Sequence, residues 1–466
     1  MEKELRIIIK ISKIIFLLVA MPLFVMLFSS RVFALEPSSQ NQANDEITTE
    51  EVTAPILEIN RLMEKAKSYS YEIQIGAKNR EINTQGIKIE RSEYYPKLNL
   101  QAGTEYTKNM HDNNIGMVTT VGDMFLNPYT RYQSIMGLVL SYNLFDFGVR
   151  RGKLDIAKTS VQISEIENQE KCQDIYLKVL DIYTKILVIK KQIDINEEIL
   201  QIEKANLEIQ NRLYKAKQIP KNEINNSEVK VAKIQHRINE LRSILSENLE
   251  NLSYYTGERY DITSLIIREV EIPQISETDP DYTNSIVWKL YEKQIKKKDL
   301  EIKVLKRSNY PKVTAYGRYY LYGSDPSSYG SSLGDIGASN YTIGGTVSMP
   351  IFDGLKNREE IKKAEIEKTQ LEIERDKSMA EYKMRLVTLR NNLGYENDQI
   401  NTDNKILKSL NEKVSNQTRL LSKKLISPKE LNDAKIEKLE QEIELTKDNL
   451  MKFAIVKSIQ ILTNVD

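Results

Sequence analysis

The stretch SYNLFDFGVRRGKLDIAK, residues 141–158, changes character partway along its length. Up to Phe145 apolar and polar residues alternate as in a β-strand, and from about Arg150 the segment is charged and helix-forming. A second stretch, SMPIFDGLKNREEIKKAE at residues 348–365, makes the same change after Phe352. The chain therefore contains the same strand-to-helix turn twice.

The two turns belong to an internal duplication. Phe145 and Phe352 are 207 positions apart, and Tyr95-Pro96-Lys97 recurs as Tyr310-Pro311-Lys312. The same offset of 207 pairs Ile219 with Ile426, Glu223 with Glu430, and Asn225 with Asn432. We predict a first structural repeat over residues 55–260, a linker over 261–279 and a second repeat over 280–466. Each repeat should contain a helix, a β-hairpin, a long helix and a last helix.

The residues of the two turns have predictable roles. The junction residues are Phe145, Asp146 and Gly148 in the first repeat, and Phe352, Asp353 and Gly354 in the second. Aspartate is a preferred capping residue, so Asp146 and Asp353 are expected to cap the helix that begins there. Glycine tolerates a left-handed backbone, so Gly148 and Gly354 are expected to relieve the tight turn.

A heptad of mostly apolar residues runs through the predicted long helix of each repeat. Its members are Cys172, Ile175, Val179, Ile182, Ile186, Ile189, Ile193, Asn196 and Leu200, and then Met379, Tyr382, Leu386, Leu389, Leu393, Glu396, Ile400, Asp403 and Leu407. Such a seam is typical of a coiled coil. Apolar residues beside the first seam allow packing on two sides, as in a wall of helices. A plain two-stranded coiled coil is the alternative.

The long helices are expected to end in hairpin tips. Proline is absent between Arg150 and Lys217, so a helix rising about 1.5 Å per residue would reach roughly 100 Å. The breaks carry Pro220 in the first repeat and Ser427 and Pro428 in the second. Residues 427–430 fit a capping box with proline at the first helical position. Each rod should therefore turn back on itself.

Four segments alternate between apolar and polar residues over about ten positions, the length of a tilted membrane strand. They lie at residues 97–107, 134–145, 312–322 and 341–350. A soluble sheet with one wet face explains the alternation equally well. Tyrosine favours the membrane, because 81 of the 466 positions, at 94–142 and 310–341, hold 13 of the 25 tyrosines. The Gly/Ser-rich segment 323–340 should form an exterior loop.

Four strands are too few to close a membrane barrel, since about eight are the minimum and open sheet edges are not tolerated in lipid. The barrel must therefore be shared among copies of the chain. Two, three or four copies would each satisfy this requirement, and the strand pattern does not choose between them.

The N-terminus is typical of a secretory signal. Four basic residues precede an uncharged apolar run at residues 14–28, which is shorter than the about 20 residues of a membrane span. We predict a signal peptide over residues 1–34, with an uncleaved anchor as the alternative. Residues 35–54 are polar and acidic, and we expect them to form a flexible tail.

Composition excludes several function classes. Removing residues 1–34 takes away five basic and two acidic residues, which leaves 62 Lys and Arg against 64 Asp and Glu. This balance gives no reason to expect a nucleic-acid partner. Cys172 is the only cysteine, so an intrachain disulfide is excluded. The sequence carries no metal cluster, phosphate loop or nucleophile motif, and predicts neither an enzyme nor a cofactor.

The duplicated order of helix, Tyr-Pro-Lys, strand hairpin, Phe-Asp turn, long helix, break and last helix resembles the TolC-like outer-membrane efflux proteins. The resemblance covers nearly all of the chain after residue 34. It implies a homotrimer with a shared 12-stranded β-barrel in outer-membrane lipid and a periplasmic tunnel of long α-helices. It also implies a passive exit duct for efflux or type I secretion, joined through a periplasmic adaptor protein to an inner-membrane transporter.

The resemblance further places the periplasmic entrance at the helix tips. Glu430 and Asp433 match the segment in which carboxylates ring the pore, and the first repeat offers Glu223 and Asn226 there. The alternative is that these acids only favour a helix N-terminus. The turn glycine common in the family is missing, and Lys424 lies nearby.

Two other classes of protein share some of these features. A periplasmic adaptor is also exported and rich in coiled coil, but it should show one central helical hairpin between soluble β-domains. A structural surface coiled coil explains the heptads but neither the strand pairs nor the duplication. The sequence leaves the transported substrate open.

Overall fold

The computed structural model describes residues 56–106, 119–121, 124–126, 132–261, 266–267, 272–273 and 282–463. The expected signal peptide (1–34) and N-terminal tail (35–54) lie outside these residues, as does most of the expected linker (261–279). The chain forms two compact units, one built on strands and one on helices.

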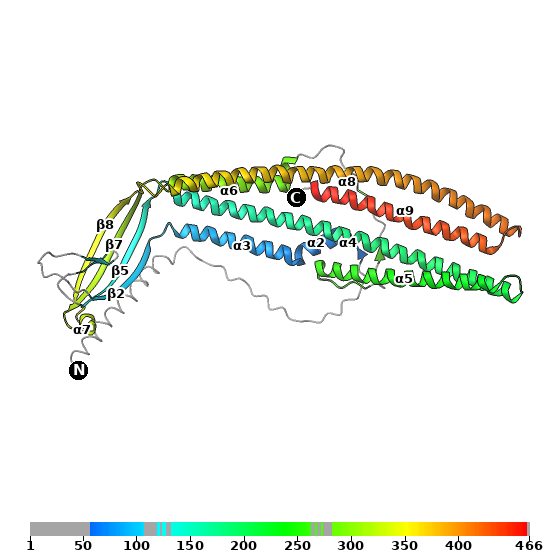
Figure 1. Cartoon of the computed structure of the whole chain (residues 1–466), viewed down its shortest axis with the longest axis horizontal. Coiled ribbons are helices and arrows are strands. Elements are labelled where there is room, and N and C mark those ends of the chain that lie inside the picture. Colours follow the sequence, from blue (N-terminus) through cyan, green and yellow to red (C-terminus); the bar gives the residue numbers. More distant parts are fainter. Residues whose placement is uncertain are drawn as a thin grey trace. The chain divides into compact units, whose positions relative to one another are not determined.

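The strand unit is an antiparallel sheet of four strands (Figure 1). The strands are β2 (Lys97–Tyr106), β5 (Tyr132–Phe145), β7 (Lys312–Asp325) and β8 (Ala338–Ser348), in the order β2-β5-β7-β8. All four strands predicted from the sequence are therefore present. The two hairpins are joined because β5 of the first repeat pairs with β7 of the second. A short pair, β3 (Thr119–Val121) and β4 (Met124–Leu126), was not predicted.

The register gives this sheet one apolar and one polar face. Residues directly opposite each other on paired strands share a face. The row Leu100, Leu138, Tyr319 and Tyr341 crosses all four strands on what we call the apolar face. Its large side chains are exposed: Leu98, Leu100, Leu140, Tyr319, Tyr341, Ile343 and Val347. This face has no covering layer along most of its length within the described chain.

The opposite, polar face carries the row Asn99, Val139, Arg318 and Thr342. The Tyr320 hydroxyl on this face donates to Gln101 Oε1 at 3.3 Å. Tyr320 is buried and packs on Ile135. The alternation predicted from the sequence therefore separates the two faces of one continuous sheet.

The second hairpin connection differs from the expected loop over 323–340. Strand β7 continues to Asp325, helix α7 (Tyr329–Gly334) follows, and β8 begins at Ala338. The Asp325 Oδ1 atom accepts from the backbone N–H of Ser327 at 2.7 Å and of Ser328 at 3.2 Å. This side-chain turn and the Ser328 cap on Ser331 N order a segment that composition alone marks as a loop.

The helical unit contains the same set of helices twice. The first set is α3 (Tyr71–Ser92), α4 (Val149–Lys215) and α5 (Lys221–Thr256), and the second is α6 (Ile286–Arg307), α8 (Lys356–Ser422) and α9 (Pro428–Thr463). Corresponding helices have equal lengths of 22, 67 and 36 residues. We infer that they descend from one duplicated ancestor.

Three short elements complete the helical unit. Helix α2 (Ile59–Tyr69) precedes α3, and the 3-10 turn η2 (Tyr282–Asn284) precedes α6. Strands β1 (Ile56–Leu57) and β6 (Ile266–Ile267) form a parallel pair. Ser70 separates α2 from α3 with an extended ψ of 128°, where the sequence suggested one unbroken helix. No helix in the described ranges is long and apolar enough to cross a bilayer.

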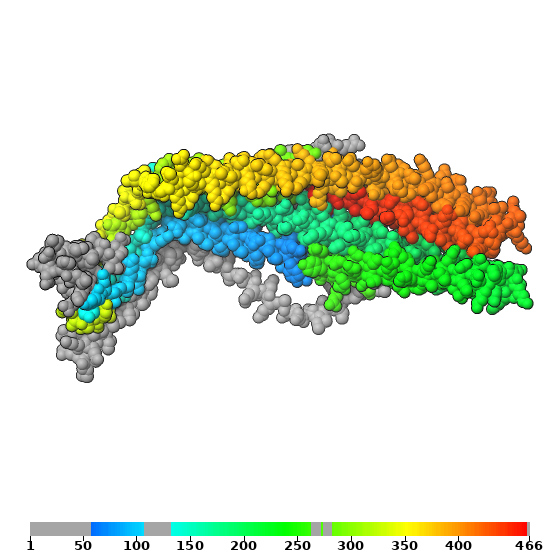
Figure 2. Space-filling view, viewed as in Figure 1, coloured from blue at the N-terminus to red at the C-terminus, as the bar shows by residue number. Residues whose placement is uncertain are grey.

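The long helices pack side by side in a layer (Figure 1). Near the strand-to-helix turns the neighbours run α3, α4, α6 and α8, and along the other half they run α5, α4, α9 and α8. Helix α4 thus has partners on both sides, as its two apolar stripes predicted. Helix α8, yellow to orange in Figure 2, forms one edge of the layer, and α3 and α5 form the other.

The main core lies on α4 in the first repeat. Ile175, Val179, Ile186 and Ile193 of the predicted seam are buried there, together with residues of α2 and α5. Cys172 is half-buried against this cluster, and burial raises the pKa of its thiol. Helix α2 covers this part of α4, whereas the described residues directly before α6 form the three-residue turn η2. The seam of α8 is less buried, because Met379 and Leu386 are the only apolar residues of that seam that are buried.

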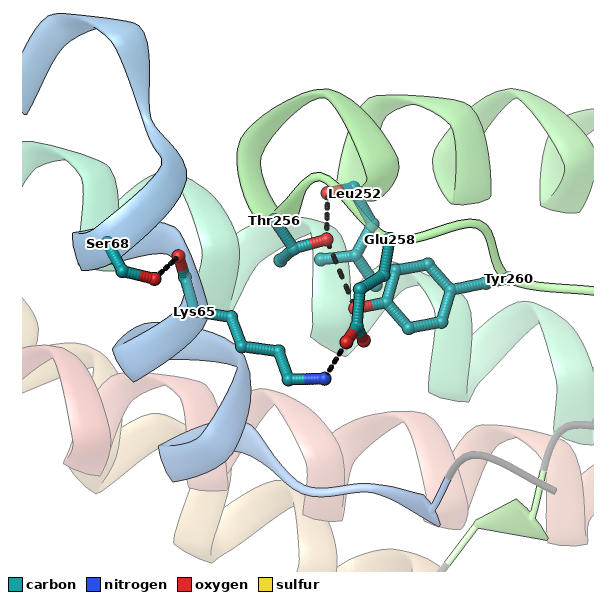
Figure 3. A network of polar contacts seen from close by, with 6 residues as sticks. All are labelled: Lys65, Ser68, Leu252, Thr256, Glu258 and Tyr260. Atoms are coloured by element: carbon teal, nitrogen blue, oxygen red, sulfur yellow. Dashed lines mark hydrogen bonds and ion pairs between the residues drawn. The ribbon is translucent and has the colours of Figure 1, made fainter. Parts of the chain in front are cut away.

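A polar network fixes α2 to the end of α5 (Figure 3). Lys65 Nζ contacts Glu258 Oε1, and the Tyr260 hydroxyl lies within hydrogen-bond distance of Thr256 Oγ1 (3.1 Å) and Glu258 Oε2 (3.3 Å). Burial raises the pKa of Tyr260 to about 12. Between these residues Gly257 ends α5 with a left-handed φ of 74°, and its N–H donates to Ser253 O at 2.8 Å.

We expect Gly257→Ala to destabilise the helical unit by about 2 kcal/mol. A left-handed alanine costs about 1 kcal/mol or more, and its Cβ would lie 2.5 Å from the Tyr69 ring. The matched control is Gly394→Ala in α8, where a Cβ would meet no atom within 4 Å. That change should raise stability by about 0.5 kcal/mol or more, because alanine favours a helix interior. Thermal unfolding followed by circular dichroism compares the two, and equal melting temperatures would contradict the Gly257 account.

Candidate functional site: the strand-to-helix turns and the helix tips

The first strand-to-helix turn is organised by Asp146. Its Oδ1 accepts from Gly148 N at 3.1 Å, and its Oδ2 accepts from Arg150 N at 3.2 Å and from Arg150 Nε at 2.8 Å. Both side chains are nearly buried, with 11% and 12% of their surface exposed. Asp146 therefore caps α4 as expected and also pairs with an arginine one turn later.

The same arginine ties the turn to the end of α3. Arg150 Nη1 donates to Glu93 O at 3.2 Å, and its guanidinium lies 4.8 Å from the centre of the Tyr94 ring. On the other side, Phe147 packs on Tyr310 with ring centres 5.3 Å apart. The turn thus joins residues that are far apart in the sequence, next to both Tyr-Pro motifs.

The second turn is simpler. Asp353 Oδ2 accepts from Asn357 N at 3.0 Å, which caps α8. Asn357 Nδ2 donates to Leu305 O at 3.2 Å and so links this turn to the end of α6. No arginine corresponds to Arg150, because the residue at the equivalent position is Asn357 itself.

The glycines occupy different positions in the two turns. Each turn contains two consecutive left-handed residues, Phe147 (φ 52°) with Gly148 (φ 82°), and Gly354 with Leu355 (both φ 69°). With the 207-residue offset, Gly148 corresponds to Leu355 and Gly354 to Phe147. Both glycines adopt the left-handed backbone that was expected of them, but at different positions of the turn. The turn requires two left-handed residues, and each repeat supplies glycine at only one of them.

We expect Asp146→Ala to lower the unfolding free energy by about 2 kcal/mol, since it removes a cap and leaves the nearly buried Arg150 without this partner. Asp353→Ala removes only the cap of α8 and should cost about 1 kcal/mol. Chemical denaturation of the detergent-solubilised protein measures both. A larger loss at Asp353 than at Asp146 would show that the Arg150 contact contributes nothing.

The hairpin tips are closed by lysines in left-handed conformation. Lys217 and Lys424 have φ values of 60° and 59°, and they occupy corresponding positions after α4 and α8. The residue after each lysine donates a backbone hydrogen bond to the last turn of the helix: Gln218 N to Leu213 O at 2.9 Å, and Leu425 N to Leu420 O at 3.0 Å. This is a Schellman-type helix end, which usually uses glycine. Because lysine replaces glycine here, the left-handed backbone destabilises each tip by about 1 kcal/mol.

Helix α9 begins as the sequence predicted. Pro428 is its first residue, and Ser427 Oγ accepts from Glu430 N at 3.3 Å. In return the Glu430 carboxylate accepts from Ser427 N at 3.3 Å and Ser427 Oγ at 2.9 Å. The carboxylate of Glu430 is thus engaged in a reciprocal capping box.

The four entrance candidates lie at equivalent places on two helices. Glu223 and Asn226 are the third and sixth residues of α5, and Glu430 and Asp433 are the third and sixth residues of α9. Glu223 is half-buried, and the other three are exposed. Since α5 and α9 each pack on α4, the first pair and the second pair lie on different helices of the layer.

Sequence reasoning missed a buried polar segment between the tips and the core. On α4, Glu203, Asn206 and Gln210 are all at least 95% buried. Gln210 Oε1 accepts from Ser227 Oγ of α5 at 2.7 Å, and Asn206 Oδ1 accepts from Asn432 Nδ2 of α9 at 2.7 Å. The 3-4 spacing of the seam continues past Leu200 to Glu203 and Gln210, so the heptad pattern could have predicted that these two polar residues are buried.

The chain is similar to one protein family in sequence and to several solved structures in fold. The model of the outer membrane efflux protein family matches residues 62–258. A structure of CusC has a TM-score of 0.71 at 14% identity and covers 93% of this chain and 100% of its own. VceC from Vibrio cholerae has a TM-score of 0.68 at 14% identity, over 87% and 96%. The Campylobacter jejuni CmeC outer membrane channel has a TM-score of 0.67 at 14% identity, over 87% and 85%.

No curated protein sequence matches the chain. The structural likeness, at these identities, establishes the fold, and the family match covers the first repeat from α2 to the end of α5. The predicted resemblance to the TolC-like outer-membrane efflux proteins is therefore confirmed, through the family match over residues 62–258 and the shared fold over most of the chain.

Proposed function

We propose that three copies of this chain form a passive exit duct, rather than an enzyme, that crosses the outer membrane and extends into the periplasm. The duct would serve a tripartite efflux or type I secretion system, joined through a periplasmic adaptor protein to an inner-membrane transporter. The four-stranded sheets would combine into one 12-stranded barrel in lipid, and the long helices would form the periplasmic tunnel. The family match and the shared fold support this function.

The observation that carries the proposal is that the layer of helices exposes apolar side chains along both of its edges. Helix α3 exposes Ile75, Ile82 and Ile89, which are spaced seven residues apart. At the opposite edge α8 exposes Ile366, Ile373 and Val387, at multiples of the same spacing. Heptad stripes of this kind bury their side chains against another helix. A neighbouring copy supplies that helix when the α3 edge of one chain meets the α8 edge of the next.

The two edge strands of the sheet also need partners from neighbouring copies. Its edge strands β2 and β8 leave one side of each strand without a ladder partner among the described strands. In lipid such edges are costly, because no water satisfies the backbone N–H and C=O groups. Pairing β2 of one copy with β8 of the next removes them, and the exposed apolar face then meets the acyl chains.

Cross-linking between the two helical edges tests the assembly. In a Cys172→Ser background, Ile82→Cys and Ile373→Cys would be combined and treated with a flexible bismaleimide. We expect a covalent trimer on denaturing gels of outer-membrane extracts, and monomers from each single-cysteine control. A water-soluble monomer that resists cross-linking would overturn the proposal.

We also propose that the helix tips form the periplasmic entrance, with Glu223, Asn226, Glu430 and Asp433 near its opening. Three copies would place three Asp433 carboxylates around one axis, and like charges at close range favour the binding of cations. Glu430 is engaged by Ser427, so Asp433 is the acid of α9 better able to bind a passing cation.

We therefore expect Asp433→Asn to weaken the block of a reconstituted pore by multivalent cations added from the periplasmic side. Glu430→Gln should change the block less, because glutamine also completes a capping box. Planar-bilayer conductance compares the two variants with the unaltered protein. Identical block in all three would mean that these acids act only at the helix N-terminus.

A further inference from the structure

The β7–β8 connection folds back onto the apolar face of the sheet. Gly323 lies on that face, in register with Ser134 of β5. A Cβ built on Gly323 would lie 2.0 Å from Ser332 O and 2.9 Å from Ile336 Cγ1. Residues after α7 and within it therefore cover the apolar face directly at this point, and only glycine leaves room for them.

Two hydrogen bonds hold α7 in this position. Ser332 Oγ donates to Gly323 O at 3.1 Å and lies 2.8 Å from Ser134 Oγ. Ser332 and Ser134 are almost fully buried, with 0% and 1% of their surface exposed. The Gly337 N–H also donates to Tyr322 O at 3.2 Å. These hydrogen bonds hold the connection against the sheet, with the Ile336 side chain beside Gly323, while Tyr329 and Leu333 of α7 keep much of their surface exposed.

Those apolar side chains continue a row of tyrosines across the end of the sheet. The Tyr106 and Tyr132 rings of β2 and β5 are 5.0 Å apart, and Tyr132 and Tyr329 of α7 are 4.7 Å apart in an edge-on arrangement. Tyr329 is 42% exposed, and Leu333, one turn later on the same side of α7, is 52% exposed. Tyr106, Tyr132, Tyr329 and Leu333 form what we call the tyrosine collar.

The position of the collar along the strands is fixed by the chain. Strands β2, β5, β7 and β8 join the helices at Lys97, Phe145, Lys312 and Ser348, so the collar lies at the opposite ends, where the hairpin connections are. If the helices are periplasmic, these ends are the extracellular ones. Tyrosine combines an apolar ring with a polar hydroxyl and is enriched where acyl chains meet headgroups.

We propose that the tyrosine collar is a lipid-contacting surface that seats α7 at the boundary between acyl chains and headgroups in the outer leaflet. This inference rests on the proposed function, since it requires the sheet to be part of an outer-membrane barrel. The connection therefore lies on the outer wall of the barrel near its rim, where it anchors the strand ends at a fixed depth.

Fluorescence quenching in vesicles tests the proposal. The only tryptophan, Trp288, would be replaced by phenylalanine, and single tryptophans introduced as Tyr329→Trp and Leu333→Trp. The vesicles contain phosphatidylcholine brominated either near the headgroup or near the end of the acyl chain. We expect both variants to lose about half of their emission with bromine near the headgroup and little with deep bromine, as for interfacial aromatic residues.

Two control positions on β8 make every outcome informative. Ile343 is 83% exposed at mid-strand on the apolar face, and its neighbour Thr342 lies on the polar face. Ile343→Trp should be quenched by deep bromine, and Thr342→Trp by aqueous iodide alone. If Ile343→Trp responds to lipid but Tyr329→Trp and Leu333→Trp respond only to iodide, the collar proposal is wrong and the barrel stands. If Ile343→Trp also escapes the brominated lipids, the proposed function itself fails.

Discussion

Replacing Ile186 with aspartate should prevent the chain from forming a stable helical unit. Ile186 has none of its surface exposed and lies in the apolar cluster formed by α2, α4 and α5. A carboxylate there is cut off from water and lacks a cationic partner, which costs about 3–5 kcal/mol or more. Single domains are stable by only about 5–15 kcal/mol, so the loss takes a large share of the total. We expect little or no folded protein in membrane extracts.

Ile186 is chosen because the structure shows which residues of the predicted seam are fully buried. Ile182 belongs to the same predicted seam but is only half-buried, so the change there should be milder. The matched control is Gln201→Asp, which introduces the same charge at an exposed position of α4. Yield and melting temperature of the extracted protein measure the effect. Normal yield of Ile186→Asp together with normal yield of the control would mean that the cluster does not hold the helices together.

The local features of this fold could be predicted because they depend on neighbours in the sequence. The sequence predicted a long helix from about Arg150 to Lys217, and α4 runs from Val149 to Lys215. The alternation of Leu98 and Leu100 with polar residues sets the two faces of β2 by period alone. Likewise, the capping box at Ser427 uses only four consecutive residues.

Features that depend on distant partners were not predicted. The pairing of β5 with β7 joins the two repeats, and no local pattern specifies it. Helix α7 needs the contact of Ser332 with Ser134 from the other hairpin. The exposure of the α8 seam goes with the lack of a counterpart to α2 among the described residues of the second repeat. Among the site residues, the engagement of Glu430 by Ser427 was predictable, but the Asn206–Asn432 bond between α4 and α9 was not.

Two buried aspartates between α8 and α9 should make the stability of the second repeat depend on pH. Asp403 of α8 and Asp448 of α9 are 3% and 9% exposed and face each other between the two helices. Gln399 Nε2 donates to Asp403 Oδ1 at 3.4 Å, while Asp403 Oδ2 is buried with no hydrogen-bond partner in the described structure. In the first repeat the corresponding positions hold Asn196 and Leu241, so the pair of acids is specific to the second.

Burial raises the pKa of Asp448 from its usual 3.8 to about 6, helped by a hydrogen bond to Asp403 and by the charges of Asp403 and Glu396. Lys447 opposes this effect, although it also pairs with Glu444 at 3.1 Å. A proton on Asp448 gives Asp403 a donor and removes the repulsion between two carboxylates. The α8–α9 contact should therefore be tighter when Asp448 is protonated than when it is ionised.

This contact should lose stability as the pH rises from about 4 to about 6, by up to about 3 kcal/mol. Over that range the folded chain retains the proton on Asp448 while the unfolded chain has released it, so the unfolded state binds fewer protons and folding is penalised at higher pH. Below about pH 4 both states are protonated, and above about pH 6 both are ionised and the full penalty remains. Asp448→Asn keeps the shape and a donor without the charge.

The measurement is the difference in unfolding free energy between Asp448→Asn and the unaltered protein at several pH values, because other carboxyl groups titrate in both and cancel. We expect the variant to gain on the unaltered protein as the pH rises from 4 to 6, and then to keep a constant advantage. Asp448→Leu, the residue of the first repeat, should also remove the pH dependence. A difference that stays flat between pH 4 and 7 would mean that Asp448 is ionised in the folded chain throughout, and that water reaches the α8–α9 contact.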